Sequence, residues 1–216
     1  MITFVPTPIG NLGDITIRAR DVLTASVLIL SEDPRMTSQL LKKLGISTKK
    51  MISFGAEGES TKLHNILTEY KDIAVVSDAG MPGISDPGYA VVSVAQELSL
   101  PYTFLPGASA GVTAAAASGL VSKEYLFLGF LPHKKGRMTE WKRISKSSVP
   151  VVLYESVHRI TKAISEMQTN LDPNRPVFIA REMTKTFETY WWGKVSNLQD
   201  YQLVQKGEFV IVVGVL

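Results

Sequence analysis

The sequence predicts an α/β protein with two domains. Short runs rich in β-branched residues alternate with longer segments whose apolar residues recur every three or four positions, the spacing of an amphipathic helix. Loops rich in glycine and proline separate these segments, and the pattern restarts after Gly119. We therefore expect a first domain over residues 1–119 with a mainly parallel sheet covered by helices, and a second α/β domain over residues 120–216.

The strands of the first domain are expected where the apolar runs are short and buried in character. These runs are Ile2–Val5, Val27–Leu30, Ile73–Val76 and Tyr102–Leu105. Helices are expected at Ile15–Ser26, Met36–Leu44, Ser60–Tyr70 and Gly88–Leu98. A further helix, Ala108–Ser118, consists of small side chains, which let its backbone come close to a sheet or to a ligand.

In the second domain the same patterns predict a mixed sheet. Strands are expected at Tyr125–Leu128, Val151–Tyr154, Val177–Ala180, Phe187–Trp192 and Phe209–Val215, and helices at Lys135–Ser145 and Val157–Met167. Few residues separate the last two strands, so part of this sheet is expected to be antiparallel. Trp191 and Trp192 are neighbours in one strand and therefore point to opposite faces, which places one of them in the core.

Composition excludes several classes of protein. The chain has 216 residues, of which 45% are hydrophobic, and it has no Cys, so disorder, a disulfide scaffold, a thiolate metal site and a cysteine nucleophile are excluded. No apolar run is long enough to cross a bilayer, and the first residues lack the features of a secretory signal, so we expect a cytoplasmic protein without a membrane partner. The three His residues are scattered and no nucleotide-hydrolase, dinucleotide or zinc-enzyme motif is present, so no metal is expected.

The charge of the chain is unevenly distributed. The whole sequence carries +3, but residues 133–162 hold eight basic residues against two acidic ones, a net charge of +6. Such an excess suits a polyanionic partner, although charge alone favours the alternative of a solvated Lys/Arg surface. Trp141 lies in the same segment, where it either packs in the core or stacks on an unpaired base.

Three loops rich in glycine and proline each follow a predicted strand of the first domain. They are Thr7–Asp14, Ser77–Gly88 and Pro106–Ala110. Ligands of parallel α/β sheets lie outside the carboxyl ends of the strands. Ordinary strand-to-helix turns are the alternative, but the density of glycine and proline over three such loops favours a ligand site.

The residues of these loops also indicate the kind of ligand. None of the three loops contains Lys or Arg, which disfavours a polyphosphate. Asp78 and Asp86 are suited to ribose hydroxyls or a positive group, and Met81 and Ala108 offer apolar surface for an adenine. S-adenosylmethionine, a cation with an adenine and no phosphate, fits this inventory.

Seven motifs in order carry a resemblance to a known family. They are PTPIGNLGDIT (6–16), SEDPR (31–35), VSDAGMPGISDPG (76–88), LPGASA (105–110), GFLP (129–132), YESVHR (154–159) and AREMTKTFE (180–188). The sequence resembles the ribosomal RNA small-subunit methyltransferase I family, a branch of the tetrapyrrole methylase superfamily. This resemblance implies two α/β domains of the class III methyltransferase type, with S-adenosylmethionine in the cleft between them, and usually a homodimer. It implies 2′-O-methylation of a cytidine in small-subunit (16S) ribosomal RNA, as naked RNA or in the assembled subunit.

The resemblance also implies site residues. By position, cofactor-binding residues in the first domain would be Pro8, Ile9, Gly10, Asp78, Ala79, Gly80, Met81, Ile84, Ser85, Asp86, Pro106, Gly107 and Ala108, joined by Leu153, Tyr154, Met183 and Thr184 of the second. The sequence departs from the family at Pro34, where Thr is usual, and it lacks the short basic region that follows the last strand in other members.

Candidates for catalysis and RNA binding come from the polar motifs of the sequence. Lys185 would act as a base if burial lowered its pKa, with Glu182 and Glu155 as alternatives, and a salt bridge is the competing role for each. The expected RNA-binding residues are Arg35, Lys134, Lys135, Arg137, Lys142, Arg143, Arg159 and Arg181. Two other functions remain open, namely a tetrapyrrole C-methyltransferase (precorrin or porphyrin) and a non-catalytic RNA-binding module.

Overall fold

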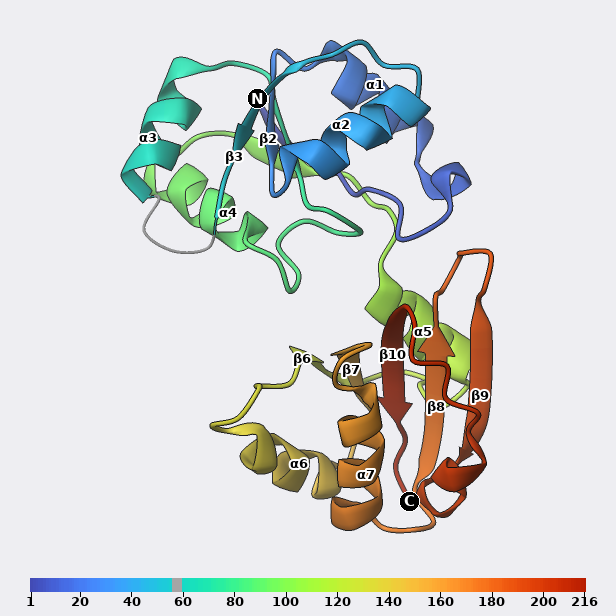
Figure 1. Cartoon of the computed structure of the whole chain (residues 1–216). Helices are drawn as coiled ribbons and strands as arrows, with labels where there is room; N and C mark the ends of the chain where they lie inside the picture. The colour runs from blue at the N-terminus through green and yellow to red at the C-terminus, as the bar shows by residue number, and fades with distance from the viewer. Residues whose placement is uncertain (56–59) are drawn as a thin grey trace. The chain divides into compact units, whose positions relative to one another are not determined.

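The computed structural model describes residues 1–55 and 60–216 (Figure 1). The chain forms two compact units, Met1–Ser109 and Ala110–Leu216. The predicted boundary after residue 119 therefore differs from the structure by ten residues, because helix α5 (Ala110–Ser118) packs against the strands of the second unit.

The first unit contains a five-stranded sheet in the order β3-β2-β4-β1-β5, with every pair of neighbours parallel. Its strands are β1 (Ile2–Phe4), β2 (Leu28–Ser31), β3 (Lys50–Ser53), β4 (Ile73–Val76) and β5 (Tyr102–Phe104). The parallel sheet and four of its strands confirm the prediction. Strand β3 was missed because it is a partly exposed edge strand, with only two consecutive apolar residues.

Helices cover both faces of this sheet, as Figure 1 shows. They are α1 (Ile17–Ala25), α2 (Pro34–Lys43), α3 (Ser60–Glu69) and α4 (Gly88–Glu97), with a 3-10 turn η1 at Leu12–Asp14. Alternate strand residues point to opposite faces. Leu30 therefore lies in one core cluster with residues of α3 and α4, whereas Ile29 lies in a second cluster with residues of α1 and α2.

The second unit contains a five-stranded sheet in the order β6-β7-β10-β8-β9. Its strands are β6 (Leu126–Phe130), β7 (Val151–Ser156), β8 (Pro176–Arg181), β9 (Thr189–Lys194) and β10 (Glu208–Val213). Only β6 and β7 pair in parallel and the other pairs are antiparallel, which confirms the predicted mixed sheet. The last strand, β10, pairs with β7 and β8 rather than with β9.

Two helices and a 3-10 segment cover one face of the second sheet, and a helix of small residues covers the other. Helices α6 (Arg137–Ser145) and α7 (Ile160–Asn170) and the 3-10 segment η2 (Val195–Asp200) pack on one face. The small residues of α5 pack on the other, where a Cβ on Gly111 would lie 3.0 Å from the Phe127 ring. The close helix-to-sheet approach predicted for this segment is therefore present.

The three tryptophans take different places in the second unit. Trp141 is fully buried between α6 and the sheet, so it cannot stack on a base. Trp191 packs on the same core cluster, whereas Trp192 lies on the opposite face against Phe178 with about half of its surface exposed. Over the described residues, no helix is long and apolar enough to span a membrane.

Candidate functional site

The loops after β1 and β4 are joined at the carboxyl edge of the first sheet. Thr7 and Gly80 each donate their backbone N–H to the carbonyl oxygen of the other at 3.0 Å. The Thr7 hydroxyl also donates to the carbonyl oxygen of Ser77 at 3.3 Å. The first two glycine- and proline-rich loops therefore form one connected surface.

The loop after β5 packs against the same surface. A Cβ on Gly80, whose φ is +79°, would lie 3.3 Å from Cγ2 of Ile9 and 3.6 Å from the carbonyl oxygen of Ala108. A Cβ on Gly107 would lie only 2.6 Å from Cβ of Pro6, closer than two such atoms approach. All three predicted loops are thus brought together, and glycine is needed where they touch.

Asp86 holds the shape of the long loop after β4. Its Oδ1 accepts the backbone N–H of Gly83 at 2.8 Å and that of Gly88 at 2.7 Å. Ser85 in the same turn has a φ of +64°, which is unusual for a residue with a side chain. This oxygen of Asp86 is therefore used inside the loop, whereas the ribose contact suggested by the sequence stays a prediction.

Asp78 is exposed and lies in a group of carboxylates from two loops. Its Oδ1 accepts the N–H of Asp33 at 3.1 Å, and its own N–H donates to Oε2 of Glu32 at 3.2 Å. Partial loss of solvent is the main cause that raises the pKa of both Glu32 and Asp78; a backbone N–H that donates to each carboxylate lowers the pKa, and the neighbouring acidic groups raise it again. Sequence reasoning missed Glu32, although the SEDPR motif follows another strand of the same parallel sheet.

Arg35 begins helix α2 beside this group. Asp33 caps the helix by accepting the N–H of Arg35 at 2.8 Å, and Pro34 occupies the first turn, where its fixed φ fits. The Arg35 guanidinium lies 2.7 Å from Oδ2 of Asp33, and its hydrogen bonds lower the Asp33 pKa to about 2. Since the Arg35 side chain is 88% exposed, it remains accessible to an anion.

The expected cofactor residues of the second unit are mostly interior. The side chains of Leu153 and Met183 are buried, so only their backbone is available to a ligand. The hydroxyl of Tyr154 accepts the backbone N–H of Gly111 at 2.9 Å, and burial raises the pKa of Tyr154. Thr184 has a φ of +65°, in a turn with an unusual backbone conformation.

The structure does not favour Lys185 as a base. Its Nζ donates to Oε1 of Glu182 at 2.8 Å and to Oε2 of Glu208 at 2.9 Å. Burial lowers the pKa of Lys185, but the hydrogen bonds to the two carboxylates outweigh this effect and the net pKa is raised. At Glu182 burial raises the pKa, but the hydrogen bonds from Lys185 and from the backbone N–H of Glu208, together with the positive charges of Lys185 and Arg181, outweigh it, and the net pKa is lowered. Lys185 and Glu182 therefore form a stable ion pair.

Glu155 and Arg137 belong to a buried ion-pair network. The Glu155 side chain is fully buried, with Oε2 3.0 Å from a guanidinium nitrogen of Arg137 and Oε1 2.9 Å from Nε of Arg159. Nε of Arg137 lies 2.7 Å from Oε2 of Glu166. The catalytic role expected for Glu155 and the RNA contact expected for Arg137 both conflict with this burial.

Arg159 and Arg181 also use their side chains within the unit. Arg159 donates to the carbonyl oxygen of Leu131 at 2.7 Å. Arg181 is 7% exposed and donates to Thr189, Phe187 and Lys206 around the end of the β8–β9 hairpin. The expected RNA-binding residues that remain exposed are Arg35, Lys134, Lys135, Lys142 and Arg143.

The loops of the first unit have the chemistry that S-adenosylmethionine requires. Gly10, Gly13 and Gly107 are exposed, Asp78 supplies a carboxylate, and Ile84 is 50% exposed. The hydroxyl of Ser77, at the start of the β4 loop, is buried and has no hydrogen-bond partner among the described residues. Within the described part of the chain, no group of acidic or histidine side chains could hold a metal ion.

Comparison with known proteins agrees with this chemistry. Residues 1–199 match the family model described as "Tetrapyrrole (Corrin/Porphyrin) Methylases". Proteins named "Ribosomal RNA small subunit methyltransferase I" are similar to the chain. The Haemophilus influenzae protein is 39% identical, over 99% of this chain and 78% of that protein. The Escherichia coli O157:H7 protein is 41% identical, over 97% of this chain and 76% of that protein. The Vibrio cholerae protein is 42% identical, over 99% and 76%.

Solved structures share the fold at low sequence identity. The methyltransferase CobJ aligns with a TM-score of 0.71 at 16% identity, covering 99% of this chain and 93% of that one. A uroporphyrin-III C-methyl transferase from Thermus thermophilus, solved in complex with S-adenosylhomocysteine, aligns with a TM-score of 0.66 at 14% identity, covering 98% and 96%. These likenesses establish a fold of the tetrapyrrole methylase type.

Proposed function

This chain belongs to the tetrapyrrole methylase family and, within it, to the ribosomal RNA small subunit methyltransferase I proteins, and we propose that it transfers a methyl group from S-adenosylmethionine to the 2′-hydroxyl of a cytidine in small-subunit ribosomal RNA. The observation that carries this proposal is the identity of 39–42% with relatives of that name over nearly the whole chain. The three connected loops without Lys or Arg support it, because they suit a cofactor that has no phosphate.

The first unit would hold the cofactor through backbone and small side chains. S-adenosylmethionine, when bound, supplies a methyl group already activated by the positive sulfonium. Gly80 and Gly107 allow the three loops to pack against one another, and Asp86 holds the β4 loop in shape before binding. Positioning of this kind lowers a barrier by about 7–11 kcal/mol when the reacting atoms are well aligned.

A group that accepts the proton of the 2′-hydroxyl would raise the rate of methyl transfer by about 10²–10⁴-fold. Among the candidates, Lys185 is held as an ammonium and Glu155 is inaccessible. Glu32 is partly exposed beside Asp78, and its raised pKa makes it a better proton acceptor than an ordinary carboxylate. Glu32 is therefore the acceptor that we propose, with exposed Arg35 next to it as a contact for a flanking phosphate.

The proposal includes the setting of the reaction. We expect a homodimer that acts in the cytoplasm on small-subunit ribosomal RNA, either free or in the assembled subunit. Methyl transfer to each of these substrates, and the mass of the protein in solution, test these points separately.

Labelled S-adenosylmethionine tests the proposed reaction. The protein is incubated with small ribosomal subunits, with naked ribosomal RNA or with a precorrin, and the label is then located. Label on a ribose oxygen supports the proposal, whereas label on a macrocycle carbon would show a tetrapyrrole C-methyltransferase. RNA binding without transfer to any substrate would show a non-catalytic module. In the same assay, Glu32→Gln should slow turnover about 10²-fold or more, while the exposed control Asp21→Asn should leave it unchanged.

A further inference from the structure

An exposed aromatic side chain ends strand β6 in the second unit. Phe130 belongs to the GFLP motif, and 51% of its surface is exposed. Its ring centroid lies 5.4 Å from that of Tyr154 at an interplanar angle of 61°, and the Arg159 guanidinium lies 5.8 Å from the same ring. Phe130 is therefore an exposed ring outside the buried core cluster of the unit, flanked by an aromatic ring and a guanidinium.

The residues that support Phe130 are themselves fixed. The Tyr154 hydroxyl is bonded to Gly111 at 2.9 Å. Arg159 is bonded to the Leu131 carbonyl oxygen at 2.7 Å and paired with Glu155 at 2.9 Å. The Phe130 ring is therefore held in place before any partner arrives, which reduces the entropy lost on binding.

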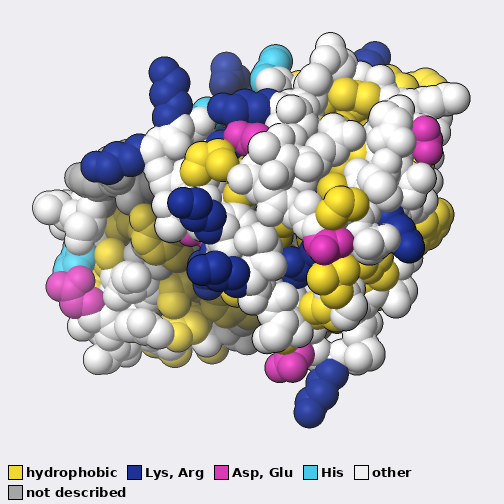
Figure 2. Space-filling model, turned by 90° about the horizontal axis from the view of Figure 1, so that it is seen from below, with side chains coloured by type: hydrophobic (Ala, Val, Ile, Leu, Met, Phe, Trp, Pro, Cys, Tyr) yellow, Lys and Arg dark blue, Asp and Glu magenta, His cyan; other side chains and the backbone are white. Residues whose placement is uncertain are grey.

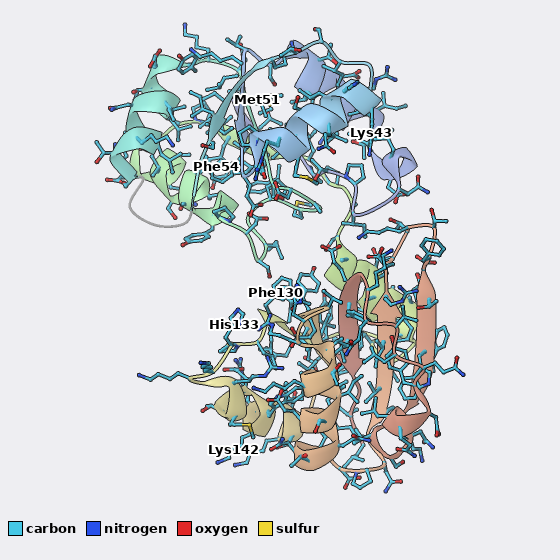
Figure 3. All side chains as sticks on the ribbon, viewed as in Figure 1. Lys43, Met51, Phe54, Phe130, His133 and Lys142 are labelled. Carbon is cyan, nitrogen blue, oxygen red and sulfur yellow. The ribbon has the colours of Figure 1, made fainter. Side chains whose placement is uncertain are left out.

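Basic side chains follow the ring directly. His133, Lys134 and Lys135 are exposed, and residues 129–136 include no acidic residue. Figure 3 shows Phe130 and His133 on the same side of the second unit, with Lys142 on the far side of α6. Arg143, next to Lys142, already pairs with Glu140 at 3.4 Å. The basic segment of the sequence is thus divided between two surfaces, and only one of them has an aromatic ring.

The positions of the Lys and Arg side chains alone do not identify a binding surface on this molecule. Figure 2 shows Lys and Arg side chains spread over the face in view, with Asp and Glu side chains among them. An exposed ring combined with flanking cations is more specific, because proteins that bind single-stranded RNA stack bases on aromatic side chains and contact the phosphates with cations. Bases within a duplex do not offer their faces for stacking in this way.

We propose that Phe130, His133, Lys134 and Lys135, here named the β6–α6 platform, bind an unpaired segment of RNA, with one base stacked on Phe130 and phosphates contacted by the two lysines. This inference rests on the proposed function and gives it a recognition surface. Lys142 and Arg143 lie outside the platform and make no such contact.

The test measures binding of a labelled single-stranded oligoribonucleotide by fluorescence anisotropy at several salt concentrations, with an RNA duplex as a second probe. Phe130→Ala should weaken binding of the single strand about 5- to 150-fold and change duplex binding little, while Phe130→Trp should retain binding. The double variant Lys134→Gln/Lys135→Gln should reduce the slope of log K against log salt by about 1.4. The control is Lys142→Gln/Arg143→Gln, which removes the same charge and should leave the slope unchanged.

The outcomes separate this inference from the function on which it rests. Melting temperature and S-adenosylhomocysteine affinity confirm that each variant is folded. If the unmodified protein methylates RNA but Phe130→Ala binds the single strand normally, the platform is wrong and the function stands. Equal effects of the two double variants would also overturn the platform. A change in the mass of Phe130→Ala in solution, with unchanged RNA binding, would show that a second copy of the chain covers this surface instead.

Discussion

Replacing Arg137 with methionine should destabilise the second unit strongly. The substitution removes a guanidinium that is 2% exposed and lies 3.0 Å from Glu155 and 2.7 Å from Glu166. Removing one partner of a buried ion pair costs about 3–5 kcal/mol, because the other charge remains buried. Here Glu155 keeps Arg159 at 2.9 Å, and Glu166 keeps Lys162 at 3.7 Å, so we expect the lower end, about 3 kcal/mol.

Urea and thermal unfolding of the whole chain measure this effect. For a unit of this size, about 3 kcal/mol corresponds to a fall of roughly 10–15 °C in the melting temperature of the transition that reports the second unit. The control is Arg143→Met, which removes the same group from an exposed pair with Glu140 at 3.4 Å. Its effect on the free energy of unfolding should stay below about 1 kcal/mol.

One result would refute this reasoning. If Arg137→Met unfolded like the unmodified protein and weakened RNA binding more than Arg143→Met did, Arg137 would be a phosphate contact, as its place in the basic segment suggested.

The remaining predictions concern the loops and the ion pair at Lys185. Gly107→Ala places a Cβ 2.6 Å from Pro6, so the loops must separate and S-adenosylhomocysteine affinity, measured by titration calorimetry, should fall at least about tenfold; unchanged affinity would contradict the packing of the loops. Burial lowers the pKa of Lys185, but its hydrogen bonds raise the pKa by more, so the folded pKa lies above the unfolded pKa of about 10.4. The ion pair of Lys185 therefore stabilises the fold fully below the unfolded pKa, and this stabilisation is lost as pH rises through the folded pKa. The destabilisation caused by Lys185→Gln should therefore be constant from about pH 7 to 9 and shrink above about pH 11, and methyl transfer should persist; loss of turnover in a stably folded variant would restore Lys185 as a catalytic group.

Most strands and helices could be predicted because the signals for them are local. The continuous apolar run Val27–Leu30, whose residues Ile29 and Leu30 are buried on opposite faces of the first sheet, is visible in a few residues of sequence. Strand β3 was missed because Lys50–Ser53 is an edge strand whose side chains are only partly buried. The unit boundary was misplaced because the small residues of α5 do not reveal which sheet they pack against.

The three glycine- and proline-rich loops were also predictable, since each is continuous in sequence and follows a parallel strand. Glu32 was missed because the sequence does not state that β2 and β4 are neighbours, which is what brings Glu32 to Asp78. The structural role of Asp86 was not predicted, because the hydrogen bonds of its Oδ1 to the N–H groups of Gly83 and Gly88 depend on the conformation of the loop.

Residue order therefore determines the α/β pattern, the three glycine- and proline-rich loops and the family of this chain, because each depends on short stretches of sequence. Tertiary structure alone decides the state of the charged side chains. Arg137 and Glu155 are 18 residues apart and meet in the interior, whereas Lys134 and Arg143 remain exposed in the same basic segment. Burial and the distance to an opposite charge govern whether an ionisable group binds RNA, moves a proton or holds the fold together, and both quantities arise only when distant segments pack.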